Sequence, residues 1–142
     1  MSVEEIKADV RRSFEAMNSG RAACLAEIDR ACAPNVVIHS SSGMEYGLEG
    51  YKKLMIQYFD AFPDLHATID DMFVEGDKAV VRYTLTGTHK GAFMGIPPTN
   101  KSTTSWAIDI YHLAGGKLVE CWTRSDTLGA MQQLGAIPTQ KK

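Results

Sequence analysis

The sequence has no long apolar run and no excess of charge of one sign. No segment reaches the roughly 18 consecutive apolar residues that a membrane-spanning helix needs, so we expect no membrane partner. Fifteen Lys and Arg residues against 17 Asp and Glu residues give a formal net charge of −2. Because no basic stripe is present, nucleic acid is not an expected partner either.

Cysteine is scarce, and the common cofactor motifs are missing. The three cysteines form no C-x-x-C pair and leave one unpaired, which predicts reduced thiols in a cytoplasmic protein. The amino terminus, MSVEEIKADVRR, is charged from its fourth residue and is not expected to be a secretory signal. The sequence contains no P-loop, no G-x-G-x-x-G and no H-E-x-x-H, and its four histidines lack metal-ligand spacing. We therefore expect no cofactor and no metal.

Two periodicities follow one another along the 142 residues, which we interpret as one domain, 1–142. A helical period and the capping box of Ser2 and Glu5 come first, and a period of two begins at Leu65. Helices followed by antiparallel hairpins predict an α+β domain, with the helices across one face of a curved antiparallel sheet that forms a cone. Its interior is a natural pocket for a small apolar molecule. The predicted helices cover about 3–17, 21–32, 48–61 and 127–134, and the predicted strands about 36–39, 65–74, 78–88, 102–113 and 118–125.

The last hairpin carries the residues best suited to chemistry. A three-residue turn with a glycine bulge pairs His112 with Leu118 and places all even-numbered residues on one face. A two-residue turn would place His112 and Asp126 on opposite faces. The Ala-Gly-Gly turn favours the first arrangement, in which Trp106, His112, Trp122 and Asp126 share one wall of the pocket. Burial there would raise the pKa of the carboxyl and make it a general acid or base near neutrality.

Structural roles compete with each of these assignments. Asp126 also stands where a helix needs an N-cap, and Asp is a preferred capping residue. The two tryptophans are also typical core residues. Arg124 has the same parity as Asp126, and we expect it to face solvent at a sheet edge. Asp109 has odd parity and is expected to face away from the pocket.

Three segments together resemble the SnoaL-like polyketide cyclases, also called ester cyclases. They are AFPDLHATIDDMFVEGDKAVVRYTLTGTHKGAFMGIPPTNK, GGKLVECWTRSD and MQQLG, of which GTHKGAFMGIPPT is the most specific. The resemblance covers about residues 47–135 and implies the cone-shaped fold of the nuclear-transport-factor-2-like superfamily. It also implies ring closure by intramolecular aldol condensation without metal or organic cofactor.

The resemblance also implies roles for individual residues. Asp126, which follows Trp122 at the end of the final strand, would be the acid/base, and His112 would be a second catalytic residue in the same pocket that donates a hydrogen bond to the enolate oxygen. His39 is similar to a further pocket histidine of the family. The remaining residues expected to contact substrate are aromatic or apolar: Trp106, Trp122, Phe14, Tyr58, Phe62, Phe93 and Met94.

Three functions remain open at this level. The first is a cofactor-independent cyclase, isomerase or lyase acting on a small hydrophobic carbonyl compound. The second is a non-catalytic binding protein for a hydrophobic ligand. The third is an epoxide hydrolase, for which Asp109 and Arg82 would have to meet in the pocket. The exposed face of such a sheet also predicts a homodimer or higher homo-oligomer.

The loop from His89 to Asn100 is expected to close one end of the cone. Gly91 and Gly95 give its backbone freedom. Phe93 and Met94 are too apolar for an ordinary surface loop, and we predict that they line the pocket entrance or a subunit contact and act as a gate.

Overall fold

The computed structural model describes residues 1–139 of the chain. The longest helix begins with the predicted capping box, in which Ser2 Oγ accepts a hydrogen bond from the Glu5 amide at 3.1 Å. None of the helices in this part of the chain is long and apolar enough to span a membrane. The helices are α1 (Val3–Asn18), α2 (Arg21–Ala31), α3 (Leu48–Ala61) and the short α4 (Thr127–Gln133).

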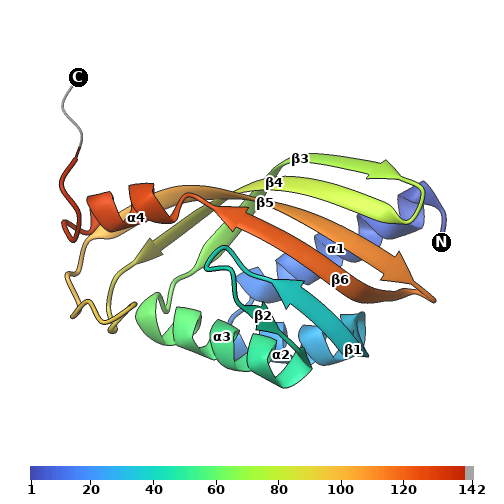
Figure 1. The fold of residues 1–142 in the computed structure, drawn as a ribbon, viewed down its shortest axis with the longest axis horizontal. Coiled ribbons are helices and arrows are strands. Elements are labelled where there is room, and N and C mark those ends of the chain that lie inside the picture. Colours follow the sequence, from blue (N-terminus) through green and yellow to red (C-terminus); the bar gives the residue numbers. More distant parts are fainter. Residues whose placement is uncertain (140–142) are drawn as a thin grey trace.

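The strands form one curved sheet of six strands in the order β2-β1-β6-β5-β4-β3 (Figure 1). β1 pairs with β6 in parallel, so the sheet is mixed, whereas the sequence predicted an antiparallel one. β1 also starts at Cys32, earlier than predicted, and its register against β6 shifts between Cys32 and Val37. The strands are β1 (Cys32–His39), β2 (Glu45–Tyr46), β3 (His66–Glu75), β4 (Lys78–Thr88), β5 (Ser102–Ala114) and β6 (Lys117–Ser125).

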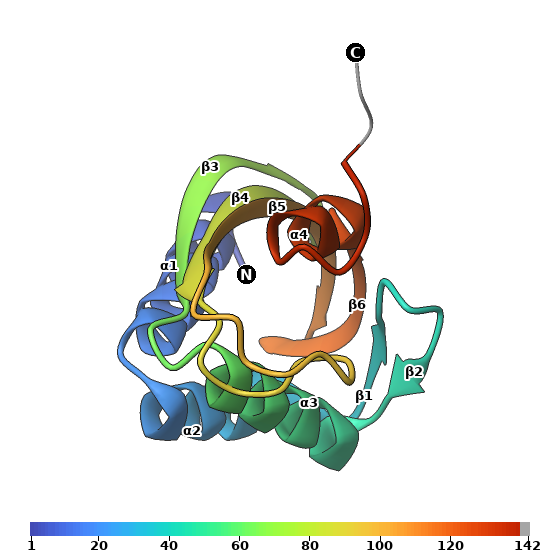
Figure 2. The ribbon, with the colours of Figure 1, turned by 90° about the vertical axis from the view of Figure 1, so that its left-hand side faces the viewer.

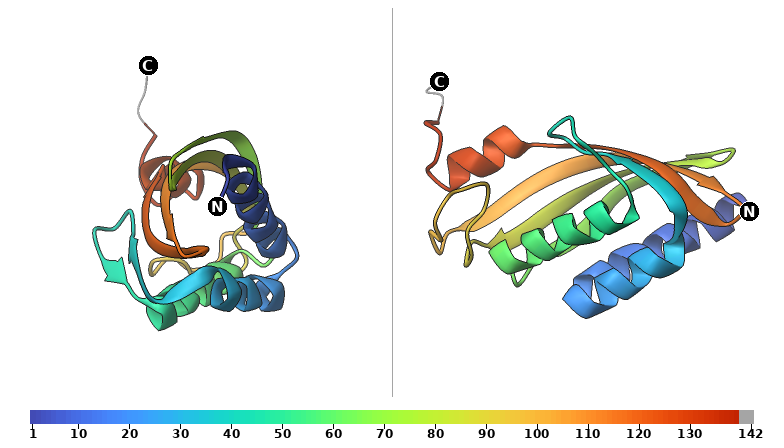
Figure 3. Two further views of the ribbon diagram at one scale, coloured as in Figure 1. Left: turned by 90° about the vertical axis from the view of Figure 1, so that its right-hand side faces the viewer. Right: turned by 60° about the horizontal axis from the view of Figure 1, so that its bottom comes forward.

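The sheet bends around α1, α2 and α3, which close its concave side (Figures 2 and 3). The odd-numbered residues of β4 and β5 point to this side and pack against α1. α2, α3 and β1 form a second cluster with Cys121 of β6. The predicted α+β cone is therefore confirmed. The buried residues of the α1 cluster are Ile6, Val10, Phe14, Ala67, Ala79, Val81, Tyr83, Ala107 and Leu113.

The turn between β5 and β6 decides which residues share a face. Ala114 pairs with Lys117 across a two-residue turn, in which Gly115 and Gly116 have φ values of 59° and 77°. A shift in register then pairs His112 with Glu120, so even-numbered residues of both strands do lie on one side. The loop was predicted with three residues, and the bulge restores the same parity. That shared side is the convex, outer one.

Candidate functional site

A buried carboxylate lies on the concave side of the sheet, in the middle of β5. Asp109 is only 6% exposed. Its Oδ2 accepts a hydrogen bond from the Tyr111 hydroxyl at 2.7 Å, and the Tyr83 hydroxyl donates to its Oδ1 at 3.1 Å. Thr123 is the register partner of Asp109 on β6. The prediction that Asp109 faces away from the interior was wrong, because the odd-numbered side of β5 is the one that the helices cover.

Burial changes the acidity of this group. Loss of hydration raises the pKa of Asp109 to about 6, although hydrogen bonds from Tyr111, Thr123 and Tyr83 act in the opposite direction. Burial, reinforced by the nearby carboxylate, holds the pKa values of Tyr83 and Tyr111 well above the ordinary range. At neutral pH the cluster therefore presents an ionised carboxylate held by two protonated phenols, and the carboxylate can take up a proton without leaving the physiological pH range.

The concave side carries small side chains beyond Asp109, toward α4. Ser105 and Ala107 follow on β5, and Thr123 and Ser125 face the same way on β6. Ser105, Thr123 and Ser125 are half-buried, so this part of the interior side keeps accessible surface. Ser41 closes it from the loop after β1, where its hydroxyl accepts from the Ser125 amide at 2.8 Å. Small hydroxyl-bearing residues next to a buried carboxylate are suited to an apolar ligand with a few polar atoms.

Several residues predicted for the pocket lie instead on the outer side of the sheet. The His39 ring stacks on Trp122 with ring centroids 5.3 Å apart. Its Nε2 lies 2.6 Å from Glu120 Oε2, and its Nδ1 lies 3.3 Å from Glu45 Oε1. Trp106 is 49% exposed on the same side. The interior therefore contains neither tryptophan, because the even-numbered residues of β5 and β6 point away from the helices.

His112 and Asp126 do not share a cavity, and that prediction was wrong. His112 lies on the outer side, where its Nε2 is 2.9 Å from Asp77 Oδ2 of the β3–β4 turn. Asp126 lies at the other end of the hairpin, since its amide donates to the Trp106 carbonyl. Trp106 and His112 are six positions apart on β5, so their Cα atoms are about 20 Å apart.

Asp126 takes the capping role that competed with catalysis. Its Oδ1 accepts a hydrogen bond from the Gly129 amide at 2.9 Å at the start of α4. The side chain is half-buried, so capping leaves part of it accessible. Arg124 is exposed, as expected, and donates to the carbonyl oxygens of Thr123 and Ser40 at 2.8 and 3.3 Å.

The predicted aromatic residues of the helices do lie on the interior side. Phe14 of α1 packs edge-on against Tyr83 at 5.0 Å between centroids. Phe93, from the loop between β4 and β5, contacts Tyr58 of α3 and Phe62, the residue after α3, with ring centroids 5.5 and 5.2 Å apart. Met94 beside it is 63% exposed. The loop thus fastens to α3 through Phe93, while Met94 points to the surface.

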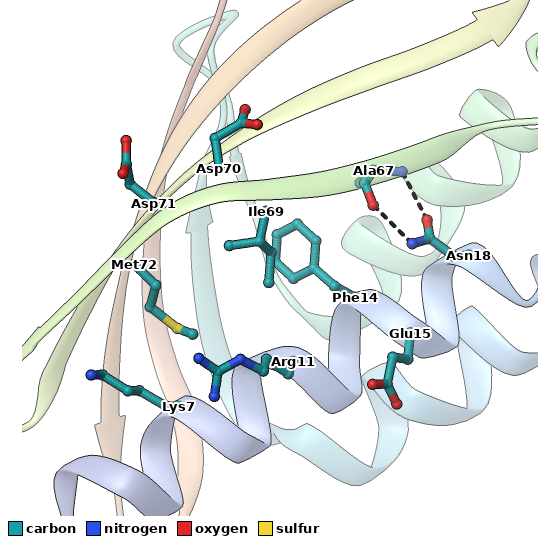
Figure 4. Close-up of a pocket in the computed structure, with 10 residues that line it drawn as sticks. All are labelled: Lys7, Arg11, Phe14, Glu15, Asn18, Ala67, Ile69, Asp70, Asp71 and Met72. Atoms are coloured by element: carbon teal, nitrogen blue, oxygen red, sulfur yellow. Dashed lines mark hydrogen bonds between the residues drawn. The ribbon is translucent and has the colours of Figure 1, made fainter.

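A groove of about 420 Å³ runs between α1 and β3, outside the interior just described (Figure 4). Charged side chains border it from both elements, including Lys7 and Arg11 of α1. At one end Asn18 and Ala67 exchange two hydrogen bonds of 2.8 Å. Of the residues predicted to contact substrate, only Phe14 reaches it, so the groove is a poor match for an apolar ligand. No three His, Cys, Asp or Glu side chains within residues 1–139 are grouped to hold a metal ion.

Comparison with known proteins identifies the family. The family model of the SnoaL-like polyketide cyclases matches residues 8–134. The chain belongs to this family. No curated protein sequence matches it significantly. This SnoaL-like chain is 30% identical to AclR, a candidate hydroxylase of Streptomyces galilaeus, over 99% of its own length and 87% of AclR, with a TM-score of 0.88.

Two further solved structures support the same assignment. TsrD from Streptomyces laurentii is 29% identical to this SnoaL-like chain, with a TM-score of 0.85 and coverage of 96% and 99% of the two chains. IdmH, a candidate polyketide cyclase of Streptomyces antibioticus, is 30% identical, with a TM-score of 0.79 and coverage of 91% and 97%. Neighbours called cyclase and hydroxylase share this fold, so the fold alone does not select the reaction.

The polar cluster around Asp109 was missed by sequence reasoning, although β4 carries a signal that finds it. Arg82 is charged and has even parity, and the register pairs it with Ile108. Arg82 forms an ion pair with Asp71 on the outer side. The even-numbered residues of β4 are mostly charged or hydroxyl-bearing and the odd-numbered ones apolar, which indicates that the even-numbered face is the solvated one. The same placement separates Arg82 from Asp109, so the pair expected of an epoxide hydrolase does not form.

Proposed function

We propose that this SnoaL-like protein is a cofactor-independent enzyme that performs acid–base chemistry at an activated carbon of a small hydrophobic carbonyl compound. The reaction is of the cyclase or isomerase type. Family membership supports the class of chemistry, and the neighbour IdmH is described as a candidate polyketide cyclase. The observation that carries the proposal is the buried carboxylate of Asp109, whose pKa is raised to about 6 and which two phenols hold in place.

In the proposed reaction, Asp109 removes a proton from a carbon next to a carbonyl group. The C–H electron pair moves to the carbonyl oxygen, and the enolate that results attacks a second carbonyl carbon of the same molecule. The new C–C bond leaves an alkoxide, which takes the proton back from Asp109. A carboxyl with a pKa near 6 serves both directions, since it is a base when ionised and an acid once protonated. The concave side of the sheet is proposed to hold the substrate in the folded geometry that ring closure needs.

Asp126 remains the rival for this role, because the family resemblance assigns the acid/base to that position. It stands at the edge of the interior, half-buried, with Oδ1 engaged by the Gly129 amide. His112 cannot assist it across the distance between the two ends of the hairpin. His112 is therefore proposed as an outer-side partner of Asp77, and His39 and both tryptophans as outer-side residues, with no contact to the reacting carbon.

The test is exchange of carbon-bound hydrogen for deuterium, measured by proton NMR with 2-tetralone, whose C1 hydrogens are acidified by ring and carbonyl together. The native protein is expected to accelerate exchange over buffer, and Asp109→Asn to reduce the acceleration at least 100-fold, the scale of a lost general base. Asp126→Asn is the matched control, because Asn preserves the cap. Full activity in Asp109→Asn with loss in Asp126→Asn would transfer the role to Asp126. Binding of the ketone without accelerated exchange would indicate a ligand-binding protein.

We also propose that the outer side of the sheet pairs with a second copy of this chain. Phe73, Val80, Ile110 and Trp122 are aligned by register across four strands, and Trp106 lies on the same side, four positions from Ile110 on β5; we call these five residues the outer patch. Phe73 is 66% exposed and Ile110 38%. Contiguous apolar surface of this kind is typical of an interface. A reducing, cytoplasmic location is proposed as well, since the three cysteines are buried and free.

A further inference from the structure

His89 has a buried hydrogen-bond donor with nothing to bind. Its side chain is 0% exposed and follows directly after β4. Within residues 1–139 the ring nitrogen Nε2 has no hydrogen-bond partner. Buried polar groups in folded proteins nearly always have a partner, because leaving one unpaired forfeits its hydration without compensation. An unpaired donor inside a compact chain therefore needs an explanation.

The loop itself determines that Nε2 carries the ring proton. The Thr99 amide donates to His89 Nδ1 at 3.2 Å, so Nδ1 is an acceptor. The Thr99 hydroxyl, which lies 3.0 Å from the same nitrogen, accepts from the Lys101 amide and has its own proton free to donate to Nδ1. In a neutral imidazole the proton then belongs to Nε2. The unpaired atom is consequently an N–H group with a fixed direction.

The ring lies on the concave side of the sheet, at the loop end. Odd-numbered residues of β4 face the helices, and His89 continues this set after Gly87. The His89 ring packs against the ring of Phe62, the residue after α3, with ring centroids 5.5 Å apart. Gly87 makes room for this arrangement, since a Cβ there would lie 3.0 Å from the Phe62 Cβ. The donor is thus held against the aromatic wall to which Phe93 also packs.

The loop that follows His89 is hydrogen-bonded to the end of α3 and has a strained backbone. The amides of Lys90 and Gly91 both donate to the Ala61 carbonyl at the end of α3, at 2.9 and 3.1 Å. Met94 and Asn100 have φ values of 48° and 58°, and they are the non-glycine residues of positive φ in the described chain. Both belong to the loop between β4 and β5. Strain of this kind concentrates at segments that bind or move.

We propose that His89 is a ligand-binding residue, whose Nε2–H donates to an oxygen of the ligand at the loop end of the interior. The ligand group is a carbonyl, enolate or hydroxyl oxygen on an otherwise apolar skeleton. This inference rests on the proposed function, which places the ligand on the concave side of the sheet. Asp109 lies beside Val81, eight positions from His89 along β4 and so about 26 Å away, which means that a small ligand held by His89 does not contact Asp109 at the same time.

Because Nε2 is buried, the loop between β4 and β5 must move before a ligand can reach this atom. A ligand reaches the donor when Phe93 moves away from Phe62, the ring that contacts both Phe93 and His89. Binding then supplies the hydrogen bond that the closed loop leaves unmade. The hydrogen bonds from Thr99 keep the ring in the same tautomer throughout.

The experiment compares two probes of one shape, 2-acetylnaphthalene and 2-ethylnaphthalene, of which only the first offers an oxygen. His89→Asn removes the Nε2–H but keeps an acceptor near the place of Nδ1 for the Thr99 amide. Thr99→Val is the matched control, because it weakens the loop contact and leaves the Nε2–H in place. Dissociation constants are measured by fluorescence titration, and thermal unfolding is followed for each variant. We expect His89→Asn to weaken the ketone about fivefold and the hydrocarbon not at all, the scale of one neutral hydrogen bond.

Every outcome separates this inference from the proposed function. Equal weakening of both probes, or the same loss in Thr99→Val, would show that His89 only supports the loop, and would overturn the inference. A native protein that binds neither probe, or binds both equally, would also overturn it. A ketone-selective loss in His89→Asn, together with absent hydrogen exchange in the native protein, would retain the binding role of His89 and reject the proposed catalysis.

Discussion

The two sides of the sheet both carry carboxylates and place them in different surroundings. On the outer side, His39 stacks on Trp122 between the carboxylates of Glu45 and Glu120. The carboxylate side chains there are 67% and 35% exposed. Water screens such pairs, so they contribute little free energy to folding.

On the inner side of the sheet, on β5, burial changes the acidity of a carboxylate. Asp109 has no cationic partner among residues 1–139, yet hydroxyl groups of Tyr83 and Tyr111 satisfy its oxygens. Removal of water raises its pKa to about 6. The comparison teaches that the side of the strand, rather than the residue types along it, selects which carboxylate can exchange protons near neutrality.

The largest effect that separates the two sides is the pH dependence of stability. The pKa of Asp109 is about 6 in the folded protein against an ordinary 3.8. Well below pH 3.8 the carboxyl is protonated in both states. The stabilisation that this provides is lost as pH rises from the unfolded pKa through the folded pKa. The folded state then loses about 3 kcal/mol relative to the unfolded chain.

Urea unfolding of the native protein and Asp109→Asn between pH 4 and pH 8 measures this loss. The free energy of unfolding of the native protein, minus that of the variant, should fall by about 2 kcal/mol across this range, since the unfolded carboxyl is already more than half ionised at pH 4. Groups with lowered pKa values, such as Glu27 and Asp77, cancel in the difference. A difference that does not change with pH would mean that Asp109 is not the perturbed acid.

Two adjacent valines of β4 give the next largest contrast. Val81 is 0% exposed on the inner side, whereas Val80 is half-buried on the outer patch. Val81→Ala should reduce the free energy of unfolding by about 2 kcal/mol, because it leaves a cavity. Val80→Ala should cost less than about 1 kcal/mol in the monomer. Chemical denaturation checks both, and equal losses would contradict the assignment of the two faces.

The outer patch predicts an effect on assembly. We expect Phe73→Ala to weaken self-association about tenfold, since truncation of an exposed aromatic at an interface typically costs more than 1 kcal/mol. Sedimentation measures the change, with Thr68→Ala, an exposed change on the same strand, as the control. Elution of the native protein as a monomer of 15.6 kDa at micromolar concentration would reject the second copy.

The smallest effect concerns the loop. Phe93 is half-buried between Tyr58 and Phe62. As a gate, Phe93→Ala should change the exchange rate of a bound ketone while lowering stability by less than about 1 kcal/mol. Relaxation-dispersion NMR and thermal unfolding measure the two quantities. A loss of several kcal/mol would show that Phe93 belongs to the core.

Much of the fold could be predicted from the sequence, because local signals determine it. The helical face of α1, the capping box of Ser2 and the stop at Pro63 are each set by residues close in sequence. The parallel pairing of β1 with β6 could not be predicted, since it joins segments about 80 residues apart and no turn fixes it.

The candidate site was predicted less well, for one physical reason. The shared side of His112 and Trp122 was predicted correctly, but the bulky apolar residues of β5 were assigned to the interior. Trp106 and Ile110 are instead exposed. Alternation along a strand says that two faces exist and not which of them the helices cover. The charged Arg82 of β4, read together with the pairing of β4 and β5, resolves that choice.

The most direct test of the central role of Asp109 is the pH dependence of ketone hydrogen exchange, recorded beside a carbon-13 titration of the Asp109 carboxyl. The exchange rate should rise with a midpoint near 6, the pKa of Asp109, and the carboxyl signal should titrate with the same midpoint. Asp126→Asn should leave both curves unchanged. Exchange that persists in Asp109→Asn and is lost in Asp126→Asn, with the Asp109 carboxyl titrating independently of the exchange rate, would contradict the account.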